Sequence, residues 1–302
     1  MDDIPEAATI SVWAYDPSFP LAVVTTVVYA LIFIAIAYQT FMRHRTWYFA
    51  VVVVGAAMEV PGYAFRCYSI KNQSDIAIYA ASLTLVVLAP VLVAAGNYIL
   101  LGHLVRELSH LDTTGRTQRP LMCGLRGQLI SRAFIVCDII AFLVQCSGSA
   151  IATVNNWFGP SAQVGVWVLV GGLVFQLVAV LTFLCVLGQF HRRSGAAGFV
   201  RGGTKTGWEK VLMAVWISSL MIVIRCIYRV VEFAEGIDGY TFTHEWVFYV
   251  FETVPVIFAI GVFCVWHPGA YLSHSENLRR ASRGNDSDTR DFIPLEDHNA
   301  EA

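Results

Sequence analysis

The sequence predicts an all-α integral membrane protein: a seven transmembrane helix bundle with its N-terminus outside and its C-terminus in the cytoplasm. Composition is the first observation, since the 302 residues are 56% hydrophobic and only 14% charged, with a mean hydropathy of +0.60. A soluble domain this apolar could not cover its surface with polar groups, so lipid is the expected solvent. The second observation is that apolar runs long enough to cross a bilayer, about 20 residues each, recur seven times. The third is a strong asymmetry of Lys and Arg between alternate connections.

The seven runs divide the chain into three parts. In chain order the predicted spans are 20–41, 47–65, 77–101, 129–151, 164–190, 211–234 and 246–266. Residues 1–19 are expected to form an extracellular segment and 20–267 the transmembrane domain. The start is acidic and lacks a basic region of the secretory type, so the first helix is expected to be an uncleaved signal anchor. Residues 268–302 are polar and predicted to form a disordered cytoplasmic tail.

Orientation follows from the positive charges. One set of connections, together with the tail, carries Arg43, Arg45, Arg106, Arg116, Arg119, Arg126, Arg192, Arg193, Arg201, Lys205, Lys210, Arg279, Arg280, Arg283 and Arg290. The opposite set carries Lys71 alone, beside several acidic residues. Basic loops stay in the cytoplasm, so an odd number of spans leaves the N-terminus outside. The plasma membrane is the expected location, membrane lipids are the expected surroundings, and no nucleic-acid partner is expected.

Several chemistries find no support in the pattern. There is no GxxxxGK[ST] loop, so the chain itself is not expected to hydrolyse ATP. The seven cysteines are scattered, without CxxC spacing. Four histidines (His44, His103, His191 and His267) fall one per predicted cytoplasmic helix end, without His-x-x-x-His spacing. No metal and no cofactor are therefore expected.

Ionisable residues inside the spans are the candidate functional residues. They are Glu59, Arg66, Asp138, Arg225, Arg229, Glu232 and Glu252. Each costs about 2.5–3.5 kcal/mol at the middle of a membrane helix, so each needs a charged partner or a water-filled cavity. The spacing 225–229–232 puts three of them on one stripe of the sixth helix, in the outer half of the bilayer. Glu59 and Arg66 share a face of the second helix, and Glu252 lies about two turns below the outer surface of the seventh.

Two interpretations of this set remain open. The charges either form ion pairs that fix helix packing, or line a polar cavity that receives a charged headgroup. In both cases Glu59, Arg225, Arg229, Glu232 and Glu252 are expected to meet, with Glu59 or Glu252 in salt-bridge reach of an arginine. Asp138 lies deeper and has no obvious basic neighbour, which leaves protonation and a proton-coupled role open.

The remaining polar and helix-breaking residues have simpler interpretations. Gln145 and Gln176 are expected to form interhelical hydrogen bonds or to reach a headgroup. Pro61, Pro90 and Pro255 each remove a backbone hydrogen bond inside a span and are expected to bend their helices.

Several motifs together resemble a known family. The segment Glu59-Val-Pro-Gly-Tyr-Ala-Phe-Arg66 has the form ExxGYxxR, Asp138 to Gly148 fits DxxxFxxQxxG, and Gly172 to Gln176 fits GLxxQ. The longest match runs from Arg225 to Gly236 and continues with Glu245, Tyr249, Glu252 and Pro255, and His267-Pro-Gly269 closes it. In this order and over this length, the chain resembles the fungal RTA-like proteins, the lipid-translocating exporter family.

The resemblance implies a non-enzymatic function. It implies a seven-helix exporter that moves amphipathic lipids, such as sphingoid bases or related toxic lipids, and contributes to resistance. The candidate cavity residues are then Glu59, Arg66, Asp138, Gln145, Gln176, Arg225, Arg229, Glu232 and Glu252. The alternative is a seven-helix receptor or sensor of lipid-like ligands, because the topology suits either class. A zinc lipid hydrolase is a third reading, which bound metal would support. The sequence pattern defines neither an oligomeric state nor an energy source.

Overall fold

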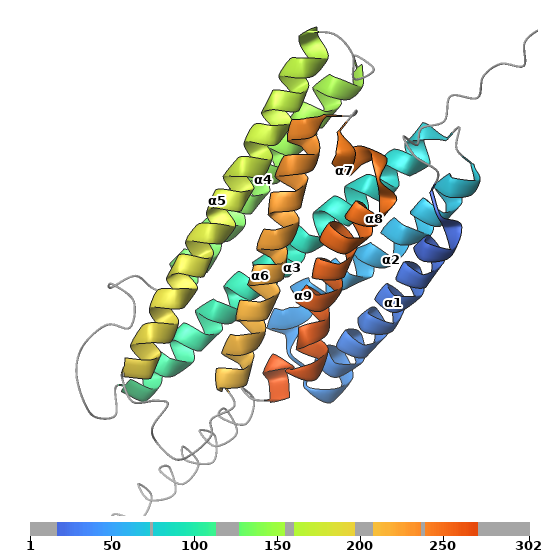
Figure 1. Cartoon of the computed structure of the whole chain (residues 1–302). Coiled ribbons are helices and arrows are strands. Elements are labelled where there is room, and N and C mark those ends of the chain that lie inside the picture. The colour runs from blue at the N-terminus through green and yellow to red at the C-terminus, as the bar shows by residue number, and fades with distance from the viewer. Residues whose placement is uncertain are drawn as a thin grey trace, which may run out of the picture.

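The computed structural model describes residues 17–72, 75–112, 127–154, 160–196, 208–236 and 239–270, which are helical with short connections (Figure 1). In chain order the elements are α1 (Phe19–Ala37), the π-helix η1 (Tyr38–Arg43), the 3₁₀-helix η2 (Trp47–Phe49), α2 (Ala50–Lys71), α3 (Ile76–Asp112), α4 (Gly127–Val154), α5 (Pro160–Ala196), α6 (Trp208–Glu235), α7 (Tyr240–Thr243), α8 (Glu245–Phe248), the π-helix η3 (Tyr249–Thr253) and α9 (Val254–Val265). Most of the predicted tail (271–302) and most of the predicted N-terminal segment (1–16) lie outside the described residues, whereas residues 268–270 continue the last helical span.

The prediction of seven membrane spans is confirmed. In the described part of the chain, seven helical segments are long and apolar enough to cross a bilayer. They run over Phe19–Arg43, Trp47–Lys71, Ala77–Arg106, Leu129–Ala152, Ala162–Arg193, Glu209–Glu235 and Glu245–Ala270. Helices α3 and α5 extend beyond their apolar runs to 37 residues each. Hydropathy marks the part of a helix that lies within the bilayer, so it predicts the membrane spans but not the polar helix ends that extend beyond them.

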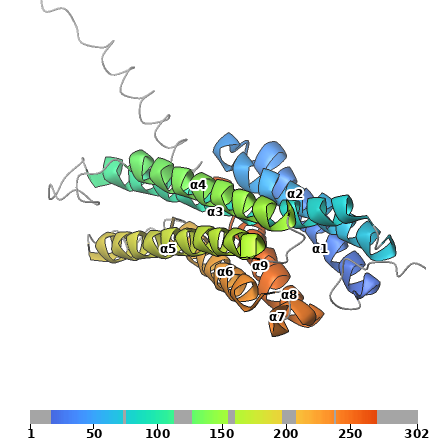
Figure 2. The same ribbon diagram turned by 90° about the horizontal axis from the view of Figure 1, so that it is seen from above.

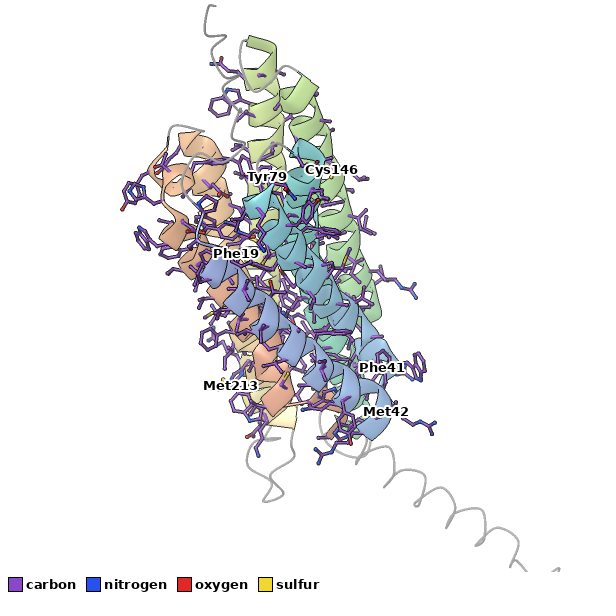
Figure 3. All side chains as sticks on the ribbon, turned by 90° about the vertical axis from the view of Figure 1, so that its right-hand side faces the viewer. Phe19, Phe41, Met42, Tyr79, Cys146 and Met213 are labelled. Carbon is purple, nitrogen blue, oxygen red and sulfur yellow. The ribbon has the colours of Figure 1, made fainter. Side chains whose placement is uncertain are left out.

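The spans form one elongated bundle in which neighbours in sequence mostly pack side by side. Helices α1 and α2 lie at one side of the bundle and α4 and α5 at the other (Figures 1 and 2). α6 packs against α5 and α9, and α9 returns to α1, so the spans close into a ring that includes α3. Within this ring α3 also contacts α6. Phe41, Met42 and Met213 lie at one end of the bundle, and Phe19 and Tyr79 lie toward the other (Figure 3). Phe19 begins the first span and Met42 lies near its end, whereas Tyr79 lies near the start of the third span and Met213 near the start of the sixth. Successive spans therefore run in opposite directions, as a chain that crosses a bilayer seven times requires.

The seventh span is not a single regular helix. It begins with the short α8, passes through the π-helix η3 and continues as α9, whose first turn contains Pro255. Proline lacks an N–H and its ring clashes with the carbonyl four residues earlier, so a widened turn directly before it relieves that clash. Glu252 lies in this widened turn. By contrast, α2 continues through Pro61 and α3 through Pro90.

Helices α4 and α5 approach each other through glycines. A Cβ on Gly148 would lie 2.5 Å from the backbone nitrogen of Leu169, and one on Gly165 would lie 2.6 Å from that of Ala152. Backbone atoms cannot move aside as a flexible side chain can, so only glycine fits at these two contacts. Small residues thus allow the backbones of α4 and α5 to approach closely at this point.

Polar contacts fasten both ends of the first span to the seventh. At one end, the Ser18 backbone N–H and hydroxyl both donate to the Glu245 carboxylate, at 2.9 Å and 2.6 Å from Oε2. At the other end, the Thr40 hydroxyl lies 3.1 Å from His267 Nε2, and the His44 and His267 rings stack at 5.0 Å. These contacts hold the first span beside the seventh at both ends.

Candidate functional site

The centre of the site is an ion-pair cluster between α6 and η3. Glu252, which is 0% exposed, accepts from two arginines one turn apart on α6. Arg225 Nη2 lies 2.8 Å and Arg225 Nε 3.0 Å from Glu252 Oε1. Arg229 binds the same carboxylate with two bonds, Nη2 to Oε1 at 2.8 Å and Nε to Oε2 at 2.9 Å. The sequence prediction that Glu59 or Glu252 pairs with one of these arginines is thus confirmed for Glu252.

A second carboxylate completes the cluster from α6 itself. Arg229 Nη1 donates to Glu232 Oε2 at 3.0 Å, and the Tyr228 hydroxyl donates to Glu232 Oε1 at 2.9 Å. Arg225 Nη2 also donates to the carbonyl of Val86 on α3 at 3.3 Å. Two guanidinium groups and two carboxylates therefore balance in charge, and several hydrogen bonds connect them. Such pairing is what allows four charges to remain buried.

Glu59 differs from the other carboxylates. It is 0% exposed on α2, and neither of its oxygens has a hydrogen-bond partner among the described residues. It lies within electrostatic range of Arg225, Arg229 and Glu252, but no ion pair joins it to them. The cluster on α6 and η3 is already neutral without it. Glu59 is thus a buried carboxylate whose hydrogen-bonding capacity is unused, a costly arrangement for a structural residue.

Two tyrosines form a wall beside Glu59. The Tyr29 and Tyr63 rings stack with centroids 5.0 Å apart, and both lie in electrostatic range of the Glu59 carboxylate. Their hydroxyls point to Thr253 in η3: Tyr29 donates to its carbonyl at 2.9 Å, and the Tyr63 hydroxyl lies 2.6 Å from its Oγ1. Sequence reasoning gave neither tyrosine a role at the site, although Tyr63 is the tyrosine of the ExxGYxxR segment. For Tyr29, the available signal was a hydroxyl inside a span without charged side chains.

Arg66 belongs to a different environment at the same end of the bundle. Its guanidinium carbon lies 4.2 Å from the centroid of the Phe248 ring and 5.6 Å from that of the Tyr249 ring. Arginine over an aromatic face is attracted by the negative face of the ring, and the attraction strengthens when the pair is desolvated. Arg66 is 2% exposed, so it is held by α8 and the start of η3. The shared face of Glu59 and Arg66 on α2 therefore meets two different parts of the seventh span.

The other candidate residues lie outside the cluster. Gln145 Nε2 donates to Gln176 Oε1 at 2.9 Å, which confirms the interhelical hydrogen bond and ties α4 to α5. Asp138 is 1% exposed, and its oxygens have no well-formed hydrogen bond among the described residues. The side chain facing it is Tyr98 of α3. No described ion pair or hydrogen bond connects these three residues to Arg225 or Arg229. The described His, Cys, Asp and Glu side chains form no group of three or more placed to hold a metal ion.

A further polar contact lies deeper in the bundle and was not predicted. Asn97 of α3 donates through Nδ2 to the hydroxyls of Ser218 and Ser219 on α6, at 3.0 Å and 3.2 Å. All three side chains are buried. Together with the hydrogen bond from Arg225 to the Val86 carbonyl, this contact fixes the axial position of α6 relative to α3.

Comparisons with known proteins agree with this architecture. The chain matches the RTA1-like protein family over residues 52–275. It is 32% identical to Protein RTM1 of Saccharomyces cerevisiae over 70% of this chain and 64% of that protein. It is 26% identical to the probable lipid transporter atnI of Emericella nidulans, over 89% of this chain and 70% of that protein.

A third relative is the sphingoid long-chain base transporter RSB1 of Saccharomyces cerevisiae, 24% identical over 87% of this chain and 75% of that protein. No solved structure matches the chain. The family match covers most of the chain, from α2 to beyond the last described residue. The chain is therefore a multi-pass membrane protein that belongs to the RTA1-like protein family.

Proposed function

We propose that the protein moves amphipathic lipids, such as sphingoid bases or related toxic lipids, across the bilayer and so contributes to resistance. Two relatives are named as transporters of lipids or long-chain bases, which supports this class over an enzyme. The single observation that carries the proposal in this chain is the Glu59 carboxylate. It is buried beside a neutral ion-pair cluster, and no described residue donates a hydrogen bond to it.

Glu59 is suited to receive a cationic headgroup. An ammonium group brings the N–H donors and the positive charge that this carboxylate lacks, and a charge-assisted hydrogen bond is stronger than a neutral one. The stacked rings of Tyr29 and Tyr63 supply an apolar and aromatic surface next to it. Arg225 and Arg229 are occupied by Glu252, so in this conformation they position the carboxylates rather than offer a free site for a phosphate.

Movement of the headgroup requires the helices to separate. Glu59, Glu252 and both arginines are each less than 5% exposed, so a ligand reaches Glu59 only when the packing around it opens. The widened turn η3 lies at this point, and its Thr253 holds both tyrosine hydroxyls. A π turn ahead of a proline is a suitable pivot, since the backbone hydrogen bonds there are already irregular. We expect η3 to move when the site opens.

The orientation and the location complete the proposal. The basic helix ends are assigned to the cytoplasm, which puts Glu59 and the ion-pair cluster in the outer half of the bilayer. In the plasma membrane, this position would give the site access to the outer leaflet. Residues 268–302 would then form the cytoplasmic tail.

The test is a transbilayer flux assay with the purified chain in liposomes, run with a sphingoid base and with phosphatidylcholine as the neutral comparison. Glu59→Gln should abolish sphingoid-base flux per folded molecule, because the amide keeps the size of the side chain and removes its charge. Glu209→Gln, at the exposed start of α6, is the matched control and should keep full flux. Unchanged flux in Glu59→Gln would refute the role of this carboxylate. Binding of the base without any flux in the wild-type chain would favour a receptor or sensor.

A further inference from the structure

A second polar feature lies far from Glu59, at the opposite end of the bundle. A groove with a volume of about 190 Å³ opens between α3 and α4. Its lining is Ile99, Gly102, His103 and Arg106 from α3 with Ser131, Arg132 and Ile135 from α4. Arg106 falls late in α3 and Arg132 early in α4, so the groove lies at the end that carries the basic connections. The positive charges assign this end to the cytoplasm.

The lining has two chemically different parts. Arg106 and Arg132, one from each helix, are both exposed, and no lining residue is acidic. By their positions along α3 and α4, both arginines belong to the end of the groove nearer the basic connections, which we call its mouth. Ile99 lies seven residues before Arg106, about 10 Å deeper along α3 at 1.5 Å per residue. Ile135 lies one turn deeper than Arg132 on α4, and Gly102 has no side chain to fill the space between the helices. The groove is thus cationic at the mouth and apolar below.

Two of the polar lining groups are held in place by other contacts. The His103 ring stacks on Tyr48 with centroids 4.4 Å apart. The Ser131 hydroxyl donates to the carbonyl of Tyr98 at 2.6 Å. These contacts stiffen the wall of the groove, whereas the two arginines carry the positive charge. Charge recognition in the groove therefore depends on Arg106 and Arg132.

We propose that this groove binds the phosphate headgroup of an anionic lipid from the cytoplasmic leaflet. Guanidinium groups match the geometry of a phosphate and bind it through paired hydrogen bonds. A groove of this volume has room for a phosphate group but not for a whole lipid. The acyl chains would extend beside Ile99 and Ile135 into the surrounding bilayer. Basic pockets between membrane helices on the cytoplasmic side are a known type of anionic-lipid site, and the cytoplasmic leaflet is rich in such lipids.

The site would be separate from the proposed transport site. It lies on α3 and α4, it holds a negative rather than a positive headgroup, and it faces the other leaflet. A lipid bound there bridges α3 and α4, which are joined in this region by a connection outside the described residues. We therefore expect the lipid to stabilise the bundle whether or not the chain transports sphingoid bases.

The test uses the full-length purified chain in phosphatidylcholine nanodiscs, with or without phosphatidic acid. Phosphatidic acid should raise the unfolding temperature and remain bound in native mass spectra, and high salt should weaken both effects. R106Q/R132Q should reduce retention of phosphatidic acid at least about tenfold, which is the loss of one charge-assisted hydrogen bond or more. R106K/R132K keeps the positive charge but lacks the planar guanidinium, so it should bind phosphatidic acid with intermediate affinity. This partial binding would show that the loss in R106Q/R132Q does not come from misfolding.

The matched control is R43Q/R192Q. It removes the same charge from exposed positions at the same end of the bundle but outside the groove. It should keep the wild-type retention of phosphatidic acid. Equal losses in the two double variants would overturn the assignment to the groove and indicate diffuse attraction to the surface. Equal stabilisation of the wild type by inorganic phosphate in phosphatidylcholine nanodiscs would overturn the assignment to a lipid.

Discussion

Arg229 and Glu252 form a doubly hydrogen-bonded ion pair inside the bundle, with Nη2 2.8 Å from Oε1 and Nε 2.9 Å from Oε2. The two residues are 23 positions apart in the chain and belong to different spans. Because Arg225 binds the same carboxylate, this single acid connects two successive turns of α6, and Glu232 supplies the second negative charge. The pair therefore joins the sixth and seventh spans at the irregular turn η3.

Removing the shared carboxylate should damage the fold. In Glu252→Gln, Arg225 loses its carboxylate partner and Arg229 keeps only Glu232, so two buried arginines share one negative charge. Breaking a buried pair in this way costs about 3–5 kcal/mol. We expect a lower unfolding temperature and lower abundance in the membrane, measured by thermal unfolding of the purified chain and by quantitative blotting. Glu209→Gln, an exposed acid on α6, should change stability by less than about 0.5 kcal/mol. A Glu252→Gln chain as stable as the wild type would show that this ion pair does not stabilise the fold.

Glycine at the α4–α5 contact should be indispensable. A methyl group at position 148 or 165 would press on backbone nitrogen atoms at 2.5–2.6 Å, so Gly148→Ala and Gly165→Ala should each cost about 1–3 kcal/mol through overpacking. Gly171 has no atom within 4 Å of an added Cβ, so Gly171→Ala is the matched control. It should be neutral, or stabilising by about 0.5–1 kcal/mol. Thermal unfolding of the three variants in one detergent makes the comparison, and equal stabilities would contradict the close approach of the helices.

The hydrogen bond from Gln145 to Gln176 should matter for packing rather than for the lipid. Gln145→Leu leaves the Gln176 amide unpaired in an apolar interior, which we expect to cost about 1 kcal/mol. The double change Gln145→Leu with Gln176→Leu should recover most of that loss, because both polar groups are then gone. Flux per folded molecule should stay at the wild-type level in both variants. A selective loss of flux in well-folded variants would instead indicate that Gln145 and Gln176 contact the transported lipid.

The orientation of the chain remains a prediction that can be tested directly. Asn72-Gln-Ser74 is a glycosylation acceptor on the side assigned to the outside, whereas Asn285-Asp-Ser287 belongs to the tail assigned to the cytoplasm. Tags at the N-terminus and the C-terminus should react with an impermeant probe from opposite sides of the membrane. Labelling of a C-terminal tag on intact cells, or a glycan on Asn285, would show that the chain is inverted.

The identity of the polar cluster was only partly predictable. The 225–229–232 stripe follows from helical periodicity, and the cost of buried charge required partners for it. The sequence did not predict that Glu252 rather than Glu59 would be this partner, because the two acids lie at comparable predicted depths. The position of Arg66 over the Phe248 ring could not be predicted either. Charge alone favours an acidic partner for Arg66, such as Glu232 or Glu252, over an aromatic ring.

The sequence by itself determined the seven spans, their order, and which of them carry buried charges, since hydropathy and helical periodicity are local properties of the chain. Tertiary structure alone decided which helix faces meet. The rotation and sliding of α2, α6 and η3 about one another depend on packing between segments far apart in the sequence. The π turn before Pro255 also changes the helical register around Glu252. In the folded chain, Glu252 in that irregular turn pairs with two arginines, whereas Glu59 has no hydrogen-bond partner among the described residues.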